Sequence, residues 1–476
     1  MQARGRVTLA GTLVVVVGVA AGWATLDALD LAPGVLTLDP PPAAAEPFPT
    51  APGAVAAPSA TPVVGDLDPG APVPDAGAVT SWARALAADT RMGSATSVMV
   101  SDVLTGHVLA DLTGSVGRTP ASTAKILTAM AAMTALGPDT TLPTTVVQPE
   151  AGRLVLVGGG DMMLAPGHGE PDAVVGHAGL ADLADTVVDR LRQEGVTDVR
   201  LDLDDTLFSG PAIHPRWDPS DVAHGYVAAV TPVAIDIAKT KPDEEYPPRY
   251  PDPALHTVAE LARLLTDAGI TVTGDPARVS APADATELAR VESAPVGQVV
   301  RYALHVSDNT IAEVLGRLVA VHRGLPGSFQ GATSAVLAQL AVDGVSVTGT
   351  LLDDCSGLSA RSRIPAAVLV GAVRHAAQPG AAQLLPVLND LPVGGLVGTL
   401  ADRFTAGPGA GLVRAKTGSL PGVTSLAGTV QTADGRLLAF AVLADRTPPG
   451  GQERPRAAID AFVQRLAACG CTGAAA

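Results

Sequence analysis

The sequence predicts an α/β protein of two or three domains. The chain has 476 residues, which is more than one ordinary hydrophobic core accommodates. Short apolar runs near both ends have the pattern of strands, at 97–101 and 107–111 and again at 413–417, 424–430 and 437–443. Apolar residues at helical spacing fill much of the chain between them. Strands and helices in one chain of this length indicate the α/β class.

The composition is that of a globular protein. Charged residues make up 16% of the chain and hydrophobic residues 47%, so enough apolar surface is available to form a core. The formal net charge is −16, and no run rich in Lys and Arg occurs. Because such runs are what follow a phosphate backbone, nucleic acid is not expected as a partner.

The first 31 residues predict a signal peptide or a membrane anchor. Arg4 and Arg6 precede the uncharged, apolar stretch from Val7 to Thr25, a pattern that directs a chain to the secretion machinery. The stretch approaches the ~20 residues that span a bilayer, which favours an anchor, whereas small residues near its end could serve a signal peptidase. We therefore expect an extracytoplasmic protein of the cell envelope, anchored by this segment or secreted.

Residues 32–75 are crowded with Pro, Ala and Gly and predict a linker. A stalk and a disordered leader without a role share this composition, so both readings stay open. A helix is expected next, over 79–90, before the first two strands.

Ser122 and Lys125 open an apolar, alanine-rich run. On a helix their spacing puts both side chains on one face. A serine hydroxyl is a weak nucleophile unless a base takes its proton, and a lysine whose pKa is lowered can be that base. The chain has only four lysines. This predicts Ser122 as a nucleophile and Lys125 as its base.

The long separation between Ser122 and the next motif indicates an insertion. A strand at 154–157, a helix at 180–191, a strand at 199–203 and a second helix around 261–265 are expected there. We assign residues 142–292 to inserted domains.

Two further motifs follow. Ser307-Asp308-Asn309 lies between helical patterns, and Lys416-Thr417-Gly418 lies on a strand-like segment. Together, Ser-x-x-Lys, Ser-Asp-Asn and Lys-Thr-Gly are the signature of penicillin-recognising serine enzymes. A plain helix cap is the alternative reading of Ser-Asp-Asn. A last helix, with Ile459, Phe462, Val463 and Leu466, should pack on the sheet.

With these motifs in order, the chain resembles the D-alanyl-D-alanine carboxypeptidase/endopeptidases, the class C low-molecular-mass penicillin-binding proteins, and is similar to their actinobacterial members. The segments at 351–359 and 391–400 extend the likeness. The resemblance implies a penicillin-recognising serine DD-peptidase/β-lactamase-like fold: an antiparallel sheet flanked by helices, plus a helical subdomain. It implies a DD-peptidase domain at 76–141 and 293–471.

The resemblance also implies the catalytic roles. Ser122 would attack the substrate carbonyl with Lys125 as base, and the Ser307 hydroxyl would shuttle the proton to the leaving amine. Asn309 would hold the peptide carbonyl. Lys416 would lower the pKa of Lys125 and attract the terminal carboxylate of the substrate.

Three further residues of the last motif would bind substrate. Thr417 and Ser419 hydroxyls would bind the carboxylate, and Gly418 would let the strand approach the acyl group. By the same resemblance, the main-chain N–H groups of Ser122 and Ser419 would form the oxyanion hole.

Within the insertion, Trp217 to Asp221 and then Tyr226 match a segment that contributes, in relatives, to the pocket for the substrate side chain. Asp221 would pair there with a free amino group of diaminopimelate-type peptides. A surface aspartate that caps a local turn is the alternative.

The expected function is that of a serine-type D-Ala-D-Ala carboxypeptidase or endopeptidase. Peptidoglycan stem peptides and cross-links would be substrates, and β-lactams covalent inhibitors. A β-lactamase is one alternative, although no Glu-x-x-Leu-Asn follows Ser307. A wall-bound sensor or scaffold that does not hydrolyse is the other.

No cofactor and no metal are expected, because the nine histidines include no His-Glu-x-x-His and the three cysteines no Cys-x-x-Cys. Outside the cytoplasm thiols tend to oxidise. We expect one disulfide, between Cys355 and either Cys469 or Cys471. A disulfide between Cys469 and Cys471 would close a strained ring across Gly470.

Overall fold

The computed structural model describes residues 23, 25–26 and 67–470. Most of the predicted anchor and linker therefore lies outside the described residues. Within the described part, no helix has both the length and the apolar character that crossing a bilayer requires.

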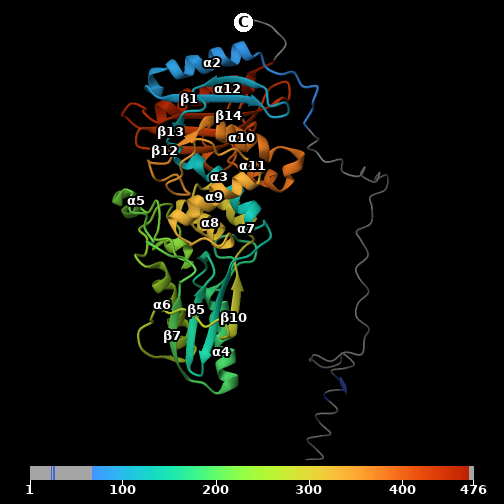
Figure 1. The fold of residues 1–476 in the computed structure, drawn as a ribbon. Helices are drawn as coiled ribbons and strands as arrows, with labels where there is room; N and C mark the ends of the chain where they lie inside the picture. The colour runs from blue at the N-terminus through green and yellow to red at the C-terminus, as the bar shows by residue number, and fades with distance from the viewer. Residues whose placement is uncertain (1–22, 24, 27–66, 471–476) are drawn as a thin grey trace, which may run out of the picture. The chain divides into compact units, whose positions relative to one another are not determined.

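Five antiparallel strands form the terminal sheet, so named because its strands come from both ends of the described chain (Figure 1). Their order is β12-β13-β14-β1-β2. The strands are β1 (Thr96–Asp102), β2 (Val108–Leu112), β12 (Val413–Leu420), β13 (Val423–Gln431) and β14 (Leu437–Ala444). β1 pairs with β14 from Thr96 opposite Ala444 to Asp102 opposite Leu438. The predicted antiparallel sheet is confirmed.

Helices cover both faces of the terminal sheet. α2 (Ala76–Ala88) and α12 (Glu453–Ala468) lie on one face (Figure 1), against large side chains such as Leu426 and Phe440. α10 (Ala366–Ala376) lies on the other face. There the strands present mainly small residues, Ala427, Ala439 and Ala441. The small residues let α10 approach the strands closely.

A helical subdomain adjoins the face that α10 covers (Figure 1). Its helices are α3 (Lys125–Ala135), α7 (Val296–His305), α8 (Asn309–His322), α9 (Phe329–Val342) and α11 (Leu385–Asn389). α8 lies at its centre, where all residues from Thr310 to Ala320 are buried. Side chains cap two of these helices: Asp308 accepts from the Ile311 N–H, and Ser328 from the Gly331 N–H.

The inserted domain contains a second five-stranded sheet, the insert sheet, in the order β10-β4-β5-β7-β9. Its strands are β4 (Pro143–Glu150), β5 (Arg153–Gly158), β7 (Asp198–Asp204), β9 (Thr271–Val272) and β10 (Thr286–Glu292). β10, β4 and β5 pair antiparallel, whereas β5, β7 and β9 pair parallel. α4 (Leu180–Glu194) and α6 (Pro253–Asp267) share a core with this sheet.

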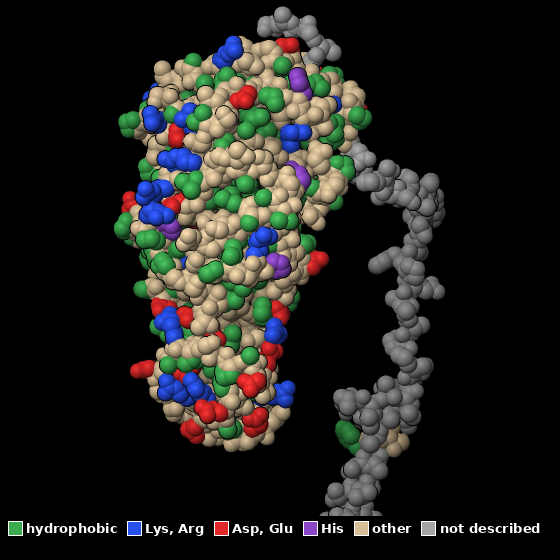
Figure 2. Space-filling model, in the orientation of Figure 1, with side chains coloured by type: hydrophobic (Ala, Val, Ile, Leu, Met, Phe, Trp, Pro, Cys, Tyr) green, Lys and Arg blue, Asp and Glu red, His purple; other side chains and the backbone are tan. Residues whose placement is uncertain are grey.

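The insertion leaves and returns at one point. The Ser293 N–H donates to the Leu142 carbonyl (3.0 Å), and the Leu142 N–H donates to Ser293 Oγ (2.9 Å). Figure 2 shows acidic and basic side chains crowded over the inserted domain and spread more thinly elsewhere on that face.

The remaining elements are short. They are η1 (Thr90–Met92), β3 (Gly117–Arg118), η2 (Ala121–Ala124), β6 (Asp161–Leu164), α5 (Pro219–Ala223), β8 (Val233–Ile235), η3 (Asp236–Ala238), β11 (Ile364–Pro365), η4 (Pro379–Leu384) and η5 (Gly398–Leu400).

The predicted disulfide at Cys355 is wrong. Cys355 is a buried free thiol packed in the core of the helical subdomain, beside Gly316 of α8. Cys469 follows α12, which lies on the opposite face of the terminal sheet. The sheet therefore separates these two cysteines, and Cys471 lies outside the described residues.

Candidate active site

Ser122 lies in η2, the turn that leads into α3. The residue before it, Ala121, has φ +47°, a left-handed conformation that is uncommon for a residue with a Cβ. Two glycines press against this backbone. A Cβ on Gly357 would collide with the Ala121 carbonyl, and a Cβ on Gly418 would lie 2.7 Å from the Pro120 oxygen. The two glycines thus let the 354–359 loop and β12 fix the turn that presents Ser122.

Lys125 lies one turn further along and is 1% exposed. Its Nζ donates to Ser122 Oγ (3.0 Å), Asn309 Oδ1 (2.6 Å) and the Ser356 carbonyl (2.8 Å). Burial lowers the pKa of Lys125 to about 8, although the carboxylates of Asp354, Asp308 and Glu313 oppose the shift. The amine is therefore held against the hydroxyl with a pKa suited to a general base.

Lys416 is the second buried amine of the site and is 0% exposed. Its Nζ donates to Ser307 Oγ (2.8 Å) and to the Thr417 carbonyl (3.3 Å). Burial and the neighbouring Lys125 amine lower its pKa well below the usual value. Each lysine thus contacts one of the two motif serines.

The Ser307-Asp308-Asn309 loop serves structure and site together. Ser307 has φ +61°, and this turn directs its hydroxyl to Lys416 while Asp308 caps α8. The Asn309 amide accepts from Lys125 and donates to the Tyr226 carbonyl (2.9 Å). The helix-cap reading therefore holds for Asp308, and the residues on either side of it lie in the site.

The hydroxyls of the last motif contact side chains from two other segments of the chain. Thr417 Oγ1 lies 2.8 Å from Thr399 Oγ1. Ser419 Oγ accepts from Arg456 Nη2 (2.9 Å), and burial lowers the pKa of this arginine. The match at 398–400 was a signal for Thr399, whereas nothing in the sequence pointed to Arg456 on α12.

The two residues predicted for the side-chain pocket differ in their relation to the site. Tyr226 contributes its carbonyl to Asn309, and its ring packs edge-on against Tyr246 at 5.0 Å. Asp221, on α5, contacts Tyr226 through the main chain, where the Tyr226 N–H donates to the Asp221 carbonyl (2.9 Å). Burial and nearby Asp218 raise the pKa of Asp221.

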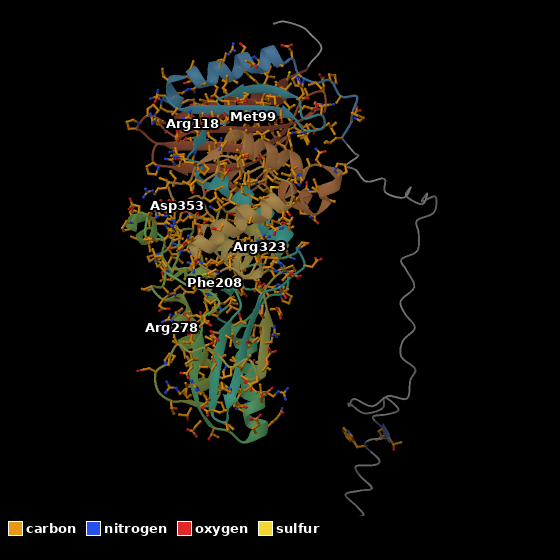
Figure 3. All side chains as sticks on the ribbon, in the orientation of Figure 1. Met99, Arg118, Phe208, Arg278, Arg323 and Asp353 are labelled. Carbon is orange, nitrogen blue, oxygen red and sulfur yellow. The ribbon has the colours of Figure 1, made fainter. Side chains whose placement is uncertain are left out.

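The 354–359 loop, which contacts Lys125 through the Ser356 carbonyl, is held in place by hydrogen bonds to two aspartates. Asp354 accepts from Trp217 Nε1 (2.8 Å) and from the Gly357 and Ser359 N–H groups. Its neighbour Asp353, labelled in Figure 3, accepts from Ser359 Oγ (2.5 Å) and forms an ion pair with an arginine of the insertion. The sequence likeness covered this loop but gave it no role.

Arg363 follows this loop and attaches it to a distant segment. The Arg363 guanidinium donates to Thr119 Oγ1 and to the Ala360 carbonyl, both at 2.8 Å. Its contacts fix the loop to the segment that precedes Ser122.

Metal-binding clusters and cavities are the other places where a ligand could bind. Across the described ranges, no group of three or more His, Cys, Asp and Glu side chains is arranged to hold a metal. A separate cavity of about 320 Å³ is lined by Phe208 and Arg278, labelled in Figure 3, and by Arg317. It does not include the motif residues.

Comparisons with known proteins identify the family of the chain. The model of the D-Ala-D-Ala carboxypeptidase 3 (S13) family matches residues 81–248 and 237–469. A carboxypeptidase of Mycobacterium tuberculosis is 39% identical over 413 residues, which cover 84% of this chain and 86% of the relative. Carboxypeptidase DacB of Mycolicibacterium smegmatis is 38% identical over 436 residues, which cover 90% and 91%.

The fold is shared with a solved structure. Penicillin-binding protein 4 of Haemophilus influenzae superposes with a TM-score of 0.68 at 23% identity, over 83% of this chain and 98% of that chain. Its complex with a β-lactam superposes with a TM-score of 0.61 at 22% identity, over 82% and 98%. From the extent of the family match and the similarity to the mycobacterial relatives, the chain belongs to the D-Ala-D-Ala carboxypeptidase 3 (S13) family.

Proposed function

We propose that this serine D-Ala-D-Ala carboxypeptidase releases the terminal D-alanine of peptidoglycan stem peptides, and cleaves cross-links, through an acyl-enzyme on Ser122. The observation that carries the proposal is the contact between Lys125 Nζ and Ser122 Oγ. The amine is buried, its pKa is lowered to about 8, and its other donors are held by Asn309 and Ser356.

The steps follow from these contacts. Lys125 takes the proton from Ser122 as the hydroxyl attacks the scissile carbonyl, and the main-chain N–H groups of Ser122 and Ser419 stabilise the oxyanion. The Ser307 hydroxyl, held by Lys416, gives its proton to the leaving D-alanine amine and regains one from protonated Lys125. The proton taken from Ser122 therefore leaves with D-alanine. Water then enters, attacks the ester and restores Ser122.

The free carboxylate of the substrate would bind beside β12. Thr417 and Ser419 present hydroxyls there, and Arg456 brings a guanidinium to within 2.9 Å of Ser419 Oγ. A charged donor strengthens a hydrogen bond to a carboxylate. This arrangement favours substrates that end in a free carboxylate.

Asp221 and Tyr226 would select the peptide side chain. We infer that Asp221 pairs with a free amine such as that of diaminopimelate. Asp221→Ala should then lower kcat/KM on amine-bearing peptides about tenfold while leaving acyl-D-Ala-D-Ala unchanged. Asp218→Ala, at the N-cap of the same short helix, is the matched control. An equal loss on both substrates would show that Asp221 is structural.

The location in the cell is a separate proposal. The positive, apolar N-terminus supports an extracytoplasmic protein held at the membrane by the Val7 to Thr25 segment. Mass spectrometry of the mature N-terminus tests this. A start between Ala21 and Pro47 would show cleavage and a secreted protein.

Treatment with benzylpenicillin tests the chemistry. The lactam carbonyl mimics the scissile amide, but the opened ring stays attached and shields the ester. We expect a persistent adduct of full penicillin mass on the Ser122 peptide, and none in Ser122→Ala. Turnover of a D-Ala-D-Ala peptide should accompany it, with little nitrocefin hydrolysis. Rapid release of penicilloate would indicate a β-lactamase, and acylation without peptide turnover a sensor.

A further inference from the structure

Glu313 is a buried acid that the steps above do not use. It lies on α8, one turn after Asn309, and is 0% exposed. Its carboxylate accepts from the Cys355 N–H (3.0 Å to Oε1) and from the Ser356 N–H (2.7 Å to Oε1). Burying a carboxylate is unfavourable unless hydrogen bonds compensate. These contacts supply that compensation.

The same two residues contact α3 through their carbonyls. The Ser356 carbonyl accepts from Lys125 Nζ (2.8 Å). The Cys355 carbonyl accepts from Thr128 Oγ1 (2.7 Å), one turn further along α3. The segment at 355–356 therefore joins α8 to the lysine, with its N–H groups on Glu313 and its carbonyls on Lys125 and Thr128.

We propose that Glu313 is a positioning residue for the general base: its carboxylate fixes the 355–356 segment, whose Ser356 carbonyl holds the Lys125 amine against Ser122. This rests on the proposed role of Lys125. Without Glu313, two buried N–H groups would lose their acceptor, and the carbonyl that orients Lys125 would be free to shift.

The charge of Glu313 gives the proposal a distinct signature. Around Glu313 lie Asp354, Arg317 and the Cys355 thiol. Burial and Asp354 raise the pKa of Glu313, whereas the main-chain donors favour its ionised form. Where Glu313 is ionised, its negative charge makes proton loss from Lys125 harder.

Lys125 itself is surrounded by a defined set of charges. Asp354, Asp308 and Glu313 raise its pKa against the effect of burial, and Lys416 is the neighbouring amine. Removing the Glu313 charge should therefore move the pKa of Lys125 down.

Three variants test the proposal by acylation with benzylpenicillin and by peptide turnover, each from pH 5 to 10 in the full protein. Glu313→Gln keeps the shape and removes the charge. We expect kcat to fall about 10- to 100-fold, as for a misplaced catalytic group, with KM changed less than about twofold. In the plot of kcat against pH, the midpoint of the rise on the acid side should move down by about half a pH unit or more.

Thr128→Val acts on the same segment without changing charge. It should lower kcat and leave the midpoint in place. Gln339→Ala, on α9, removes a buried polar side chain remote from Lys125 and should lower thermal stability without either kinetic effect.

The outcomes separate the ideas. Loss of stability in Glu313→Gln with wild-type kcat and midpoint would overturn the positioning role. If that variant does not fold, unchanged kcat in Thr128→Val would overturn it instead. Lys125→Ala, measured in the same experiment, tests the proposed function on which the role of Glu313 rests. If Lys125→Ala is acylated at the wild-type rate, the proposed function itself is wrong.

Discussion

The two five-stranded sheets differ in the partners of their buried charged side chains. In the insert sheet, Asp202 is fully buried but accepts from Arg153 and Arg200, and Arg290 pairs with acidic residues of its own strand, β10. In the terminal sheet, Arg436 is buried against Asp102. Lys416 on the same sheet donates instead to a serine hydroxyl.

The difference lies at the site and not in the sheets as a whole. Neither Lys125 nor Lys416 forms an ion pair with any residue in the described part of the chain. Asp202 and Asp102 are matched by arginines, and an ion pair offsets part of the cost of burying a charge. Buried amines without a matching carboxylate destabilise the native state, and they are confined to the place where a lowered pKa is useful.

The largest effect is expected when a buried lysine without an ion pair is removed, compared with an exposed lysine that has one. Lys125→Ala should reduce kcat/KM on a D-Ala-D-Ala peptide about 10²- to 10⁴-fold, the usual range for general-base help. Lys241→Ala, which removes an exposed lysine paired with Glu244, should leave it unchanged. A loss of less than tenfold in the first variant would contradict the role of Lys125.

Stability against pH tests the buried amine directly. Between pH 8 and 10.5 the unfolded chain binds more protons at Lys125 than the native state does, because burial lowers this pKa from 10.5 to about 8. The free energy of unfolding should rise with pH in this window, by up to about 3 kcal/mol from this residue.

Lys125→Met should lack that part of the rise. Urea denaturation of both proteins at pH 8 and pH 10 measures it. Equal slopes in the two proteins would mean that Lys125 titrates normally, and the contrast between the sheets would be lost.

In the insert sheet, removal of the buried acid should affect stability alone. Asp202→Asn leaves two arginines and the Ala277 N–H with a weaker acceptor. We expect the free energy of unfolding to fall by about 1 to 3 kcal/mol, as measured by thermal denaturation. Penicillin acylation should stay at the wild-type rate. Impaired acylation in the folded variant would show that the insert sheet acts on the site.

The smallest effect is expected at the exposed pairs of the insertion. Arg290→Ala removes an arginine whose side chain is 44% exposed, and such pairs contribute only about 0.2 to 1 kcal/mol. The difference from wild type should shrink further in 0.5 M salt. A larger, salt-insensitive change would mean that this arginine packs as well as pairs.

Local patterns made much of the fold predictable. The short apolar runs of β1 and β14 and the helical spacing of α4 and α12 lie where the sequence pattern predicted strands and helices. Ser122 and Lys125 are one turn apart, so their contact followed from helix geometry.

Contacts between distant segments could not be predicted in this way. Arg456 reaches Ser419 from α12, and Glu313 reaches Ser356 from α8, because the packing of helices sets these distances. Cys355 misled for the same reason. Its spacing to Cys469 said nothing of the sheet that lies between them.

The pairing of β1 with β14 has a consequence for how the protein is made. The insert sheet is built from one continuous segment, so it can close while later residues are still being synthesised. The terminal sheet has high contact order, because β14 at its centre must arrive before β1 has both neighbours. Ser122 therefore meets Lys416 only after nearly the whole chain exists, and a chain cut short before β12 contains the nucleophile but no active site.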